Sequence, residues 1–226
     1  MGVPQTRSLQ LAMATMGAEQ FGSELQRLGV NVSRETISAL ETYAGLLRKW
    51  QKAINLVAGS TLDDVWARHF LDSAQLVPLL PEGDGHITDL GSGAGFPGLV
   101  LALATGRPTN LVESDQRKAA FLGEVARATG CAGRVQIHAA RVEALKPWAA
   151  PIITARALAD LTQLLDWASP LLSTASVCIF PKGAKAEQEL TAALRVWKMT
   201  VERRRSVTDP TGLILRLSHL ERRGQT

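Results

Sequence analysis

The sequence predicts an α/β protein with a doubly wound, mostly parallel sheet, a C-terminal antiparallel hairpin and an N-terminal helical extension. From residue 86 onward, short apolar runs alternate with longer helical segments, an order that is typical of parallel strands joined by right-handed crossovers. A glycine-rich turn follows the first of these runs, and two strand-like runs joined by turn residues close the chain. With 226 residues, 46% of them hydrophobic, the chain can bury a substantial core.

The N-terminal part of the chain has helical rather than strand periodicity. Ser33 can cap a helix that runs towards Gln51, because apolar residues recur along it at helical spacing. A second helix is predicted to start at Thr61, and Pro78 closes the region. The predicted division is therefore a helical extension over residues 1–80 and a second domain over residues 81–226.

The second domain alternates strands and helices. The predicted strands are His86–Leu90, Asn110–Glu113, Val135–His138, Ile152–Arg156 and Ser176–Pro181. The predicted helices between them are Pro97–Ala104, Gln116–Thr129, Leu158–Ser169 and Ala184–Trp197. Two further strands, Thr200–Val207 and Gly212–His219, are joined by Asp209-Pro210-Thr211-Gly212. This turn predicts an antiparallel pair at one edge of the sheet.

The sharpest local signal is the glycine-rich turn between Asp89 and Gly98. Its glycines permit positive φ and let a ligand touch the backbone, at the carboxyl end of a central strand where doubly wound sheets bind ligands. The turn satisfies the dinucleotide pattern Gly93-x-Gly95-x-x-Gly98. Glu113 lies twenty residues beyond Gly93, where it could accept hydrogen bonds from ribose hydroxyls. An NAD-dependent oxidoreductase is therefore one candidate.

Asp89 favours a different ligand. A carboxylate two residues before Gly91 would repel a pyrophosphate and would suit the ammonium of a methionine moiety. Asp89 and Glu113 together fit S-adenosylmethionine, although Asp89 could instead only cap the turn. The chain also lacks an evident Tyr/Lys or His proton relay, which argues against the oxidoreductase.

The chain also resembles a specific family, ribosomal RNA small subunit methyltransferase G, also called glucose-inhibited division protein B. The resemblance covers roughly Ser33 to the C-terminus, and the first thirty or so residues match nothing nameable. Its motifs are Phe96-Pro97-Gly98, Glu113-Ser114, Arg117-Lys118, Phe121-Leu122, Arg141-Val142-Glu143, Arg156-Ala157 and Pro181-Lys182-Gly183. Those in the helical region are Lys49-Trp50, Asn55-Leu56 and Arg68-His69-Phe70-Leu71-Asp72-Ser73. The glycine turn alone is generic, whereas its combination with the Arg-His-x-x-Asp-Ser run is specific.

The resemblance implies a Rossmann-like methyltransferase sheet and methyl transfer from S-adenosylmethionine to N7 of a guanine in 16S ribosomal RNA. With the turn analysis, it predicts cofactor contacts from Asp89, Gly91, Gly93, Gly95, Phe96, Glu113, Val142, Glu143 and Arg156. Acceptor-side candidates are Arg156, Lys182, Arg68 and His69. No catalytic residue is assigned with certainty.

Each of these residues also has a purely structural interpretation. Phe96 could be a core residue, and Glu143 could lie on the solvated face of a short helix. Arg156 could bind only a backbone carbonyl, and Lys182 could cap the edge of the cleft. Arg68 and Asp72, four residues apart, could form only an intrahelical pair.

The sequence lacks a motif that other methyl acceptors would need, and this absence agrees with attack by a ring nitrogen of the acceptor base. After the fourth strand the chain has Thr154-Ala155-Arg156-Ala157 instead of the Asn/Asp-Pro-Pro-Tyr of amino-directed methyltransferases. Cys131 and Cys178 fit neither a disulfide framework nor a metal cluster. We expect a cytoplasmic monomer without metal or membrane span that acts on 16S RNA or the small-subunit particle. A same-fold methyltransferase for a small molecule or protein is a further candidate, and so is a noncatalytic RNA-binding module.

Overall fold

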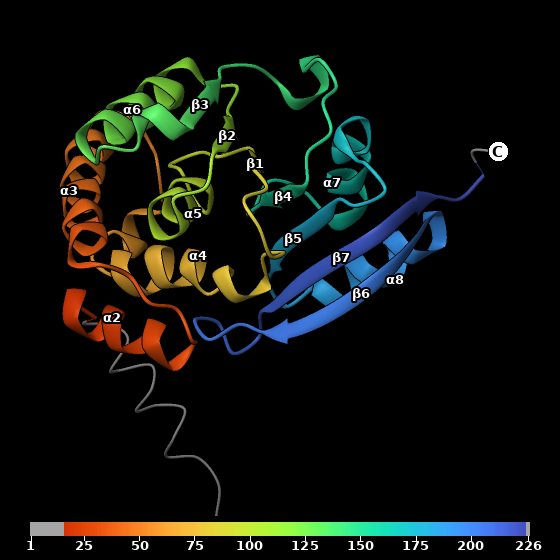
Figure 1. Cartoon of the computed structure of the whole chain (residues 1–226), viewed down its shortest axis with the longest axis horizontal. Coiled ribbons are helices and arrows are strands. Elements are labelled where there is room, and N and C mark those ends of the chain that lie inside the picture. The colour runs from red at the N-terminus through yellow and green to blue at the C-terminus, as the bar shows by residue number, and fades with distance from the viewer. Residues whose placement is uncertain (1–15, 225–226) are drawn as a thin grey trace, which may run out of the picture.

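The computed structural model describes residues 16–224, which form one seven-stranded sheet in the order β3-β2-β1-β4-β5-β7-β6 (Figure 1). Strands β1 to β5 are parallel to one another, whereas β7 is antiparallel to both β5 and β6. The strands are β1 (Ile87–Leu90), β2 (Thr109–Val112), β3 (Val135–His138), β4 (Ile152–Ala155), β5 (Val177–Lys182), β6 (Trp197–Arg205) and β7 (Leu213–Arg222). The predicted doubly wound sheet with a C-terminal antiparallel hairpin is confirmed.

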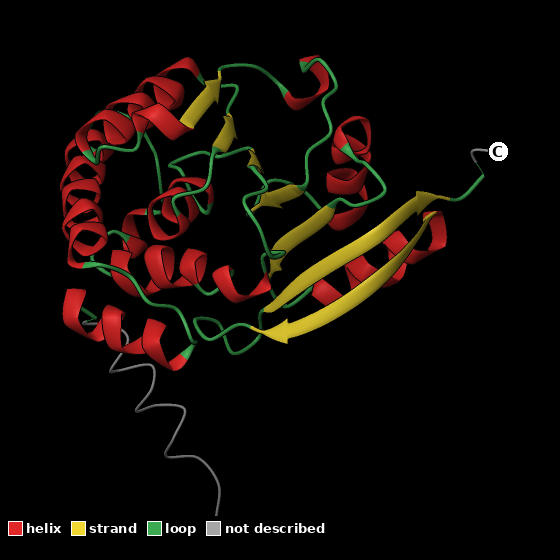
Figure 2. Ribbon diagram, viewed as in Figure 1, coloured by secondary structure: helices red, strands yellow, loops and turns green. Residues whose placement is uncertain are grey.

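Helices cover both faces of this sheet (Figure 2). One apolar cluster joins α2 (Ala18–Arg27), α3 (Arg34–Gln51), α5 (Gly98–Thr105) and α6 (Gln116–Ala128) to the sheet residue Leu111. A second cluster joins α7 (Leu161–Ala168) and α8 (Ala186–Val196) to residues that include Leu90 and Ile153. The strand order reverses between β1 and β4, so a ligand crevice is expected beyond their carboxyl ends.

The N-terminal extension contains one helix that was not predicted, α2. The first fifteen residues of the extension lie outside the described part of the chain. The Ser33 cap was predicted correctly, since its hydroxyl accepts from the Thr36 amide at 3.2 Å. Residues of α2 and α3 share a single apolar cluster with the helices on the sheet, so the division at residue 80 stays a prediction.

The helix predicted to start at Thr61 begins later, because Thr61 belongs to the separate 3-10 turn η1 (Gly59–Thr61). A continuous helical segment follows, made of the π-helical η2 (Trp66–Leu71) and α4 (Asp72–Ala74), and η3 (Val77–Leu79) comes after it. In the π turn the Asp72 amide reaches back to the Ala67 carbonyl, and the Ser73 hydroxyl donates to the His69 carbonyl at 2.6 Å. A π turn inside a helix is rare and is frequently found at a functional site.

The C-terminal hairpin is longer than predicted. Strand β6 begins at Trp197, directly after α8, and an irregularity between Lys198 and Thr200 shifts its register. The connection from β6 to β7 lies beside the α2 and α4 region in Figure 1. Over residues 16–224 no helix is long and apolar enough to cross a membrane, and no cluster of His, Cys, Asp and Glu could hold a metal ion.

Candidate active site

The glycine turn leaves β1 in a conformation that requires glycine. Gly91 and Gly93 have φ of 64° and 56°, in the left-handed region. The Glu113 carboxylate holds this turn against the end of β2: Oε2 accepts from the Gly93 amide at 2.8 Å and Oε1 from the Asp115 amide at 2.7 Å. Glu113 therefore fixes the turn and lies beside the backbone of Gly93.

Asp89 lies beneath the turn rather than in front of it. The residue is fully buried, its Oδ1 accepts from Thr154 Oγ1 at 2.8 Å, and its Oδ2 accepts from the Gly98 amide at 3.2 Å. Burial raises the pKa of this carboxyl to about 6. Its bonds match the turn-capping interpretation, and the predicted contact between Asp89 and the methionine ammonium stays a prediction.

Two of the turn glycines are needed for close packing. A Cβ on Gly98 would come within 2.7 Å of Asp89 Cβ, and a Cβ on Gly95 within 2.6 Å of Leu99 Cδ1. Gly95 also lies against the Tyr43 hydroxyl, which donates to the Ala94 carbonyl. Gly95 does not line the pocket described next, so its predicted contact with the cofactor also stays a prediction.

A pocket of about 550 Å³ opens over the turn, within the usual range for small-molecule sites. Its walls include most of the predicted cofactor residues, namely Gly91, Gly93, Phe96, Glu113, Val142, Glu143 and Arg156. An acidic side chain, exposed turn backbone and the apolar Val142 suit the ribose, the tail and the adenine of S-adenosylmethionine. We refer to it as the cofactor pocket.

Phe96 is both a core residue and part of the pocket wall. Its ring stacks on His69 with 4.8 Å between centroids and on Tyr43 with 5.4 Å. The Arg156 guanidinium lies over the same ring, 4.9 Å from its centroid. The core interpretation and the pocket interpretation of Phe96 are therefore both correct in part, since the residue is only 3% exposed yet lines the cavity.

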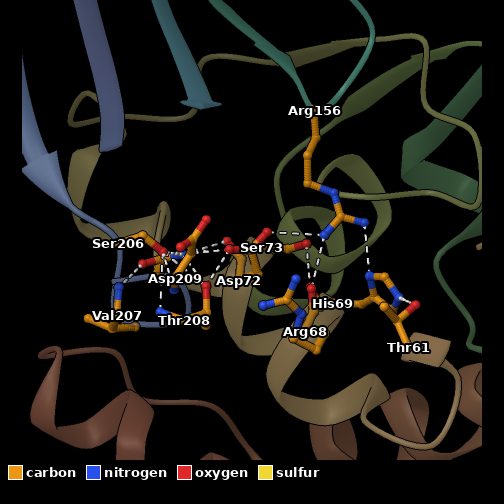
Figure 3. A network of polar contacts seen from close by, with 11 residues as sticks. Thr61, Arg68, His69, Asp72, Ser73, Arg156, Ser206, Val207, Thr208 and Asp209 are labelled. Carbon is orange, nitrogen blue, oxygen red and sulfur yellow. Dashed lines mark hydrogen bonds and ion pairs between the residues drawn. The ribbon is translucent and has the colours of Figure 1, made fainter. Parts of the chain in front are cut away.

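Arg156 is the centre of a polar network that joins the π turn to the end of β4 (Figure 3). Its guanidinium donates to the Arg68 carbonyl at 3.2 Å, to Asp72 Oδ2 at 3.1 Å and to His69 Nδ1 at 3.1 Å. The predicted intrahelical pair between Arg68 and Asp72 is thus replaced by a pair between Asp72 and Arg156. No ion pair or hydrogen bond is found for the Arg68 side chain within residues 16–224, where it is exposed.

The network fixes the protonation state of His69. A guanidinium can only donate, so Nδ1 of His69 accepts and its proton lies on Nε2. Nε2 then donates to Thr61 Oγ1 at 2.9 Å, and this hydroxyl donates to the Ala58 carbonyl at 2.8 Å. Burial and the charges of Arg156 and Arg68 lower the pKa of His69 to about 3, which keeps the ring neutral.

The low pKa of His69 predicts a loss of stability in acid. Below pH 6.5 the unfolded chain takes up a proton that the folded ring refuses, so the free energy of unfolding falls by about 1.4 kcal/mol per pH unit from this group. Asn at position 69 does not titrate. The stability advantage of the unmodified chain over His69→Asn should therefore shrink by about 2–3 kcal/mol between pH 6.5 and 4.5 in urea unfolding. A constant difference would show that His69 is not held neutral.

Asp72 carries the network on to the β6–β7 connection. Its Oδ1 accepts from Thr208 Oγ1 and from Gln75 Nε2, the latter at 2.9 Å. The Gln75 side chain in turn accepts from the Val207 amide at 2.9 Å. These bonds hold residues 206–212 against the π turn, although about 130 residues of chain separate the two segments.

A second pocket of about 470 Å³ lies between these segments. It shares Arg156, Ala157 and Leu158 with the cofactor pocket, so the two cavities adjoin at the end of β4. Its walls also include Arg68, Asp72, Asp160, Lys182, Ser206, Thr208 and Asp209. We call it the acceptor pocket. Ala157 has φ of 53°, a strained value for a non-glycine residue, and such residues cluster at functional sites.

Lys182 lines the acceptor pocket but is already engaged. Its ammonium pairs with Glu189 Oε2 at 2.8 Å and donates to the Ala159 carbonyl at 2.6 Å, and its side chain is 8% exposed. The structure therefore matches the cleft-capping interpretation, while the predicted acceptor-side role of Lys182 stays a prediction. Other residues that line the two pockets were not predicted from the sequence. Lys118 and Leu56 of the cofactor pocket belong to the quoted motifs and could have been found.

The fold and the pocket are those of a Rossmann-like protein that binds its ligand at the carboxyl ends of parallel strands, and the family match reported next makes the chain a methyltransferase that uses S-adenosylmethionine. An O-methyltransferase from Bacillus cereus in complex with SAH superimposes with a TM-score of 0.54 at 12% identity, over 89% of this chain and 100% of that one. That likeness concerns the fold alone.

The family follows from the sequence. The model of the family GidB, rRNA small subunit methyltransferase G, matches residues 36–212, and the chain belongs to this family. A ribosomal RNA small subunit methyltransferase G from Rhodospirillum centenum is 57% identical over 85% of this chain and 88% of that protein. Its counterpart from Paramagnetospirillum magneticum is 52% identical over 92% and 98%. The predicted family is confirmed, and the oxidoreductase hypothesis is wrong.

Proposed function

We propose that this enzyme transfers a methyl group from S-adenosylmethionine to N7 of a guanine in 16S ribosomal RNA. One observation carries the proposal within this family: the cofactor pocket and the acceptor pocket meet at Arg156, Ala157 and Leu158. Two reactants held in adjoining cavities can react without an intermediate on the protein. The shared segment is where the methyl group would pass from one pocket to the other.

In this proposal the cofactor pocket binds and orients the donor. Glu113 would accept from the ribose hydroxyls, and the backbone at Gly91 and Gly93 would hold the tail. Val142 and Glu143 would contact the adenine. Bound S-adenosylmethionine supplies a methyl group on a positively charged sulfur. Alignment of two bound reactants can lower a barrier by roughly 7–11 kcal/mol when the geometry is well held.

The acceptor pocket matches the charge of a methylated guanine. N7 has an in-plane lone pair and no proton, so its attack needs no general base, and the purine becomes positively charged. The carboxylates of Asp72, Asp160 and Asp209 line this pocket and favour that charge. The pair between Asp72 and Arg156 keeps the guanidinium from adding net positive charge where the two pockets meet. His69, neutral and bonded on both nitrogens, serves to position Arg156.

The target guanine must be unpaired, or splayed out of a base-paired helix, to enter this pocket. N7 faces the deep, narrow major groove of A-form RNA, so an unpaired or splayed base is the accessible target. The exposed Arg68 guanidinium at the acceptor pocket is free to meet a phosphate. We also propose that the enzyme acts as a monomer. Its proposed location is the cytoplasm, and its proposed substrate is 16S RNA or the small-subunit particle.

The absence of a required base predicts a flat pH profile. Single-turnover methyl transfer should change less than about twofold between pH 6.5 and 8.5, a window that would expose a His-like base. The pKa values of His69 and Asp89, at about 3 and about 6, both lie below this window. A tenfold rise in rate per pH unit would reveal an essential base and contradict this mechanism.

The acceptor itself is tested by radiolabel transfer. The purified enzyme is incubated with S-adenosylmethionine labelled in its methyl group and with small-subunit RNA, small-subunit particles, total protein or a small-molecule extract. We expect label in the RNA, recovered after digestion as 7-methylguanosine. Label in protein or small molecules alone would support a different acceptor on the same fold.

A further inference from the structure

A groove of about 340 Å³ lies on the other side of the β6–β7 connection from the acceptor pocket. Arg27 from the last turn of α2 and Arg204 and Arg205 from the end of β6 line it, so two segments far apart in sequence bring three guanidiniums together. The remaining walls include Leu28, Gln75, Pro78, Leu79, Val207 and Ile214. We call this cavity the arginine groove.

The three guanidiniums are available to an anionic ligand. Within residues 16–224 Arg27 pairs with Glu24 alone, and both side chains are exposed, at 75% and 36%. Arg204 pairs with Glu202, and their side chains are 63% and 39% exposed. Arg205 is exposed and has no ion pair within residues 16–224. Exposed pairs of this kind contribute little free energy, so a phosphate that makes bidentate bonds can replace the carboxylates.

The arginine groove and the acceptor pocket are separated by one short segment of the β6–β7 connection. Ser206 and Thr208 line the acceptor pocket, and Val207 between them lines the groove. The Gln75 side chain holds residues 206 and 207 in place: it accepts from the Val207 amide at 2.9 Å and donates to Ser206 Oγ at 3.2 Å. Figure 3 shows this short segment beside Asp72. A strand whose base enters the acceptor pocket need only cross Val207, 45% exposed, to reach the groove.

We propose that the arginine groove binds the phosphate backbone of the RNA strand next to the acceptor guanine, and this inference rests on the proposed function. The guanidiniums suit phosphates, and the apolar side chains of Leu28, Pro78 and Val207 suit contact with sugars. Arg27 precedes the residues matched by the family model, so the groove is built partly from a segment outside that match. Contacts of this kind position the RNA without reading its sequence.

The test compares two triple variants that remove the same charge. The groove variant removes the three cationic side chains from the arginine groove and is Arg27→Gln/Arg204→Gln/Arg205→Gln. Arg127→Gln/Arg134→Gln/Arg195→Gln, the control, removes three exposed arginines that line neither pocket nor groove. Binding of deproteinised 16S RNA is measured over a range of salt concentrations. The log–log salt slope of the groove variant should be shallower by about 2, or about 0.7 per lost phosphate contact.

The groove variant should also bind the RNA roughly tenfold or more weakly at low salt, raise KM and leave kcat and S-adenosylmethionine affinity unchanged. Equal RNA affinity and salt slope in the two triple variants would overturn the proposal. Weaker binding of the groove variant to the particle but not to deproteinised RNA would also overturn it, since a ribosomal protein would then occupy the groove. Failure of the unmodified enzyme to methylate ribosomal RNA would instead refute the proposed function.

Discussion

Gly91→Val should abolish S-adenosylmethionine binding, with an affinity loss of at least about 100-fold in titration calorimetry. The substituted residue would have to keep φ at 64°, which a β-branched side chain strongly disfavours. Its Cβ would also come within 2.8 Å of Leu158 Cδ2, in the segment that the two pockets share. Either the turn or the Leu158 side chain must then move into the cofactor pocket.

A matched control separates the pocket from the backbone strain. Gly106 has φ of 72° and ends α5, and a Cβ there meets nothing within 4 Å. Gly106→Val should lower the melting temperature without weakening S-adenosylmethionine binding. If Gly91→Val binds the cofactor as tightly as the unmodified chain, the assignment of the cofactor pocket is wrong.

Arg156→Ala should lower the rate of methyl transfer about 100-fold, because misplacement by about 1 Å can cost that much. The substitution leaves Asp72 without its ion pair and His69 Nδ1 without a donor, and it removes the cation that lies over the Phe96 ring. Both pockets also lose the Arg156 side chain from their walls. Arg156→Lys should restore little, since an ammonium cannot reproduce the planar fork that meets three partners.

The partners of Arg156 give this prediction its controls. Asp72→Asn should slow transfer, and adding it to Arg156→Ala should slow transfer little further, because residues in one network are not additive. Arg216→Ala removes an arginine of similar exposure that donates to the Leu79 carbonyl and lines neither pocket, so its rate should stay near that of the unmodified enzyme. A rate within threefold of the unmodified enzyme for Arg156→Ala would contradict the positioning role.

Sequence reasoning reached the sheet and the turn because both depend on local patterns. Alternating apolar runs indicated the parallel strands, and the spacing of Gly93 and Glu113 placed two groups that do touch, at 2.8 Å. The same reasoning could not show that Asp89 lies below the turn. A carboxylate at a strand end can face a ligand or face inward, and packing by Gly98 and Thr154 decides between them.

The polar network around Arg156 could not be predicted from the sequence, for a different reason. On a regular helix Asp72 would face Arg68, whereas in the structure it pairs with Arg156, which lies 84 residues further along the chain, beside a π turn. The β6–β7 connection carries no catalytic motif, and only its bonds to Asp72 and Gln75 reveal that it forms a wall of the acceptor pocket. Long-range pairing of this kind leaves no periodic signal in a single sequence.

The most direct test of the proposed function is the state of 16S ribosomal RNA in cells with and without the gene. Borohydride and aniline cleave an RNA strand at 7-methylguanosine. We predict one break in 16S RNA from unmodified cells that disappears in the deletion strain and returns with a plasmid copy, but not with the Gly91→Val variant. An identical cleavage pattern in the unmodified and deletion strains would contradict N7 of a 16S guanine as the acceptor.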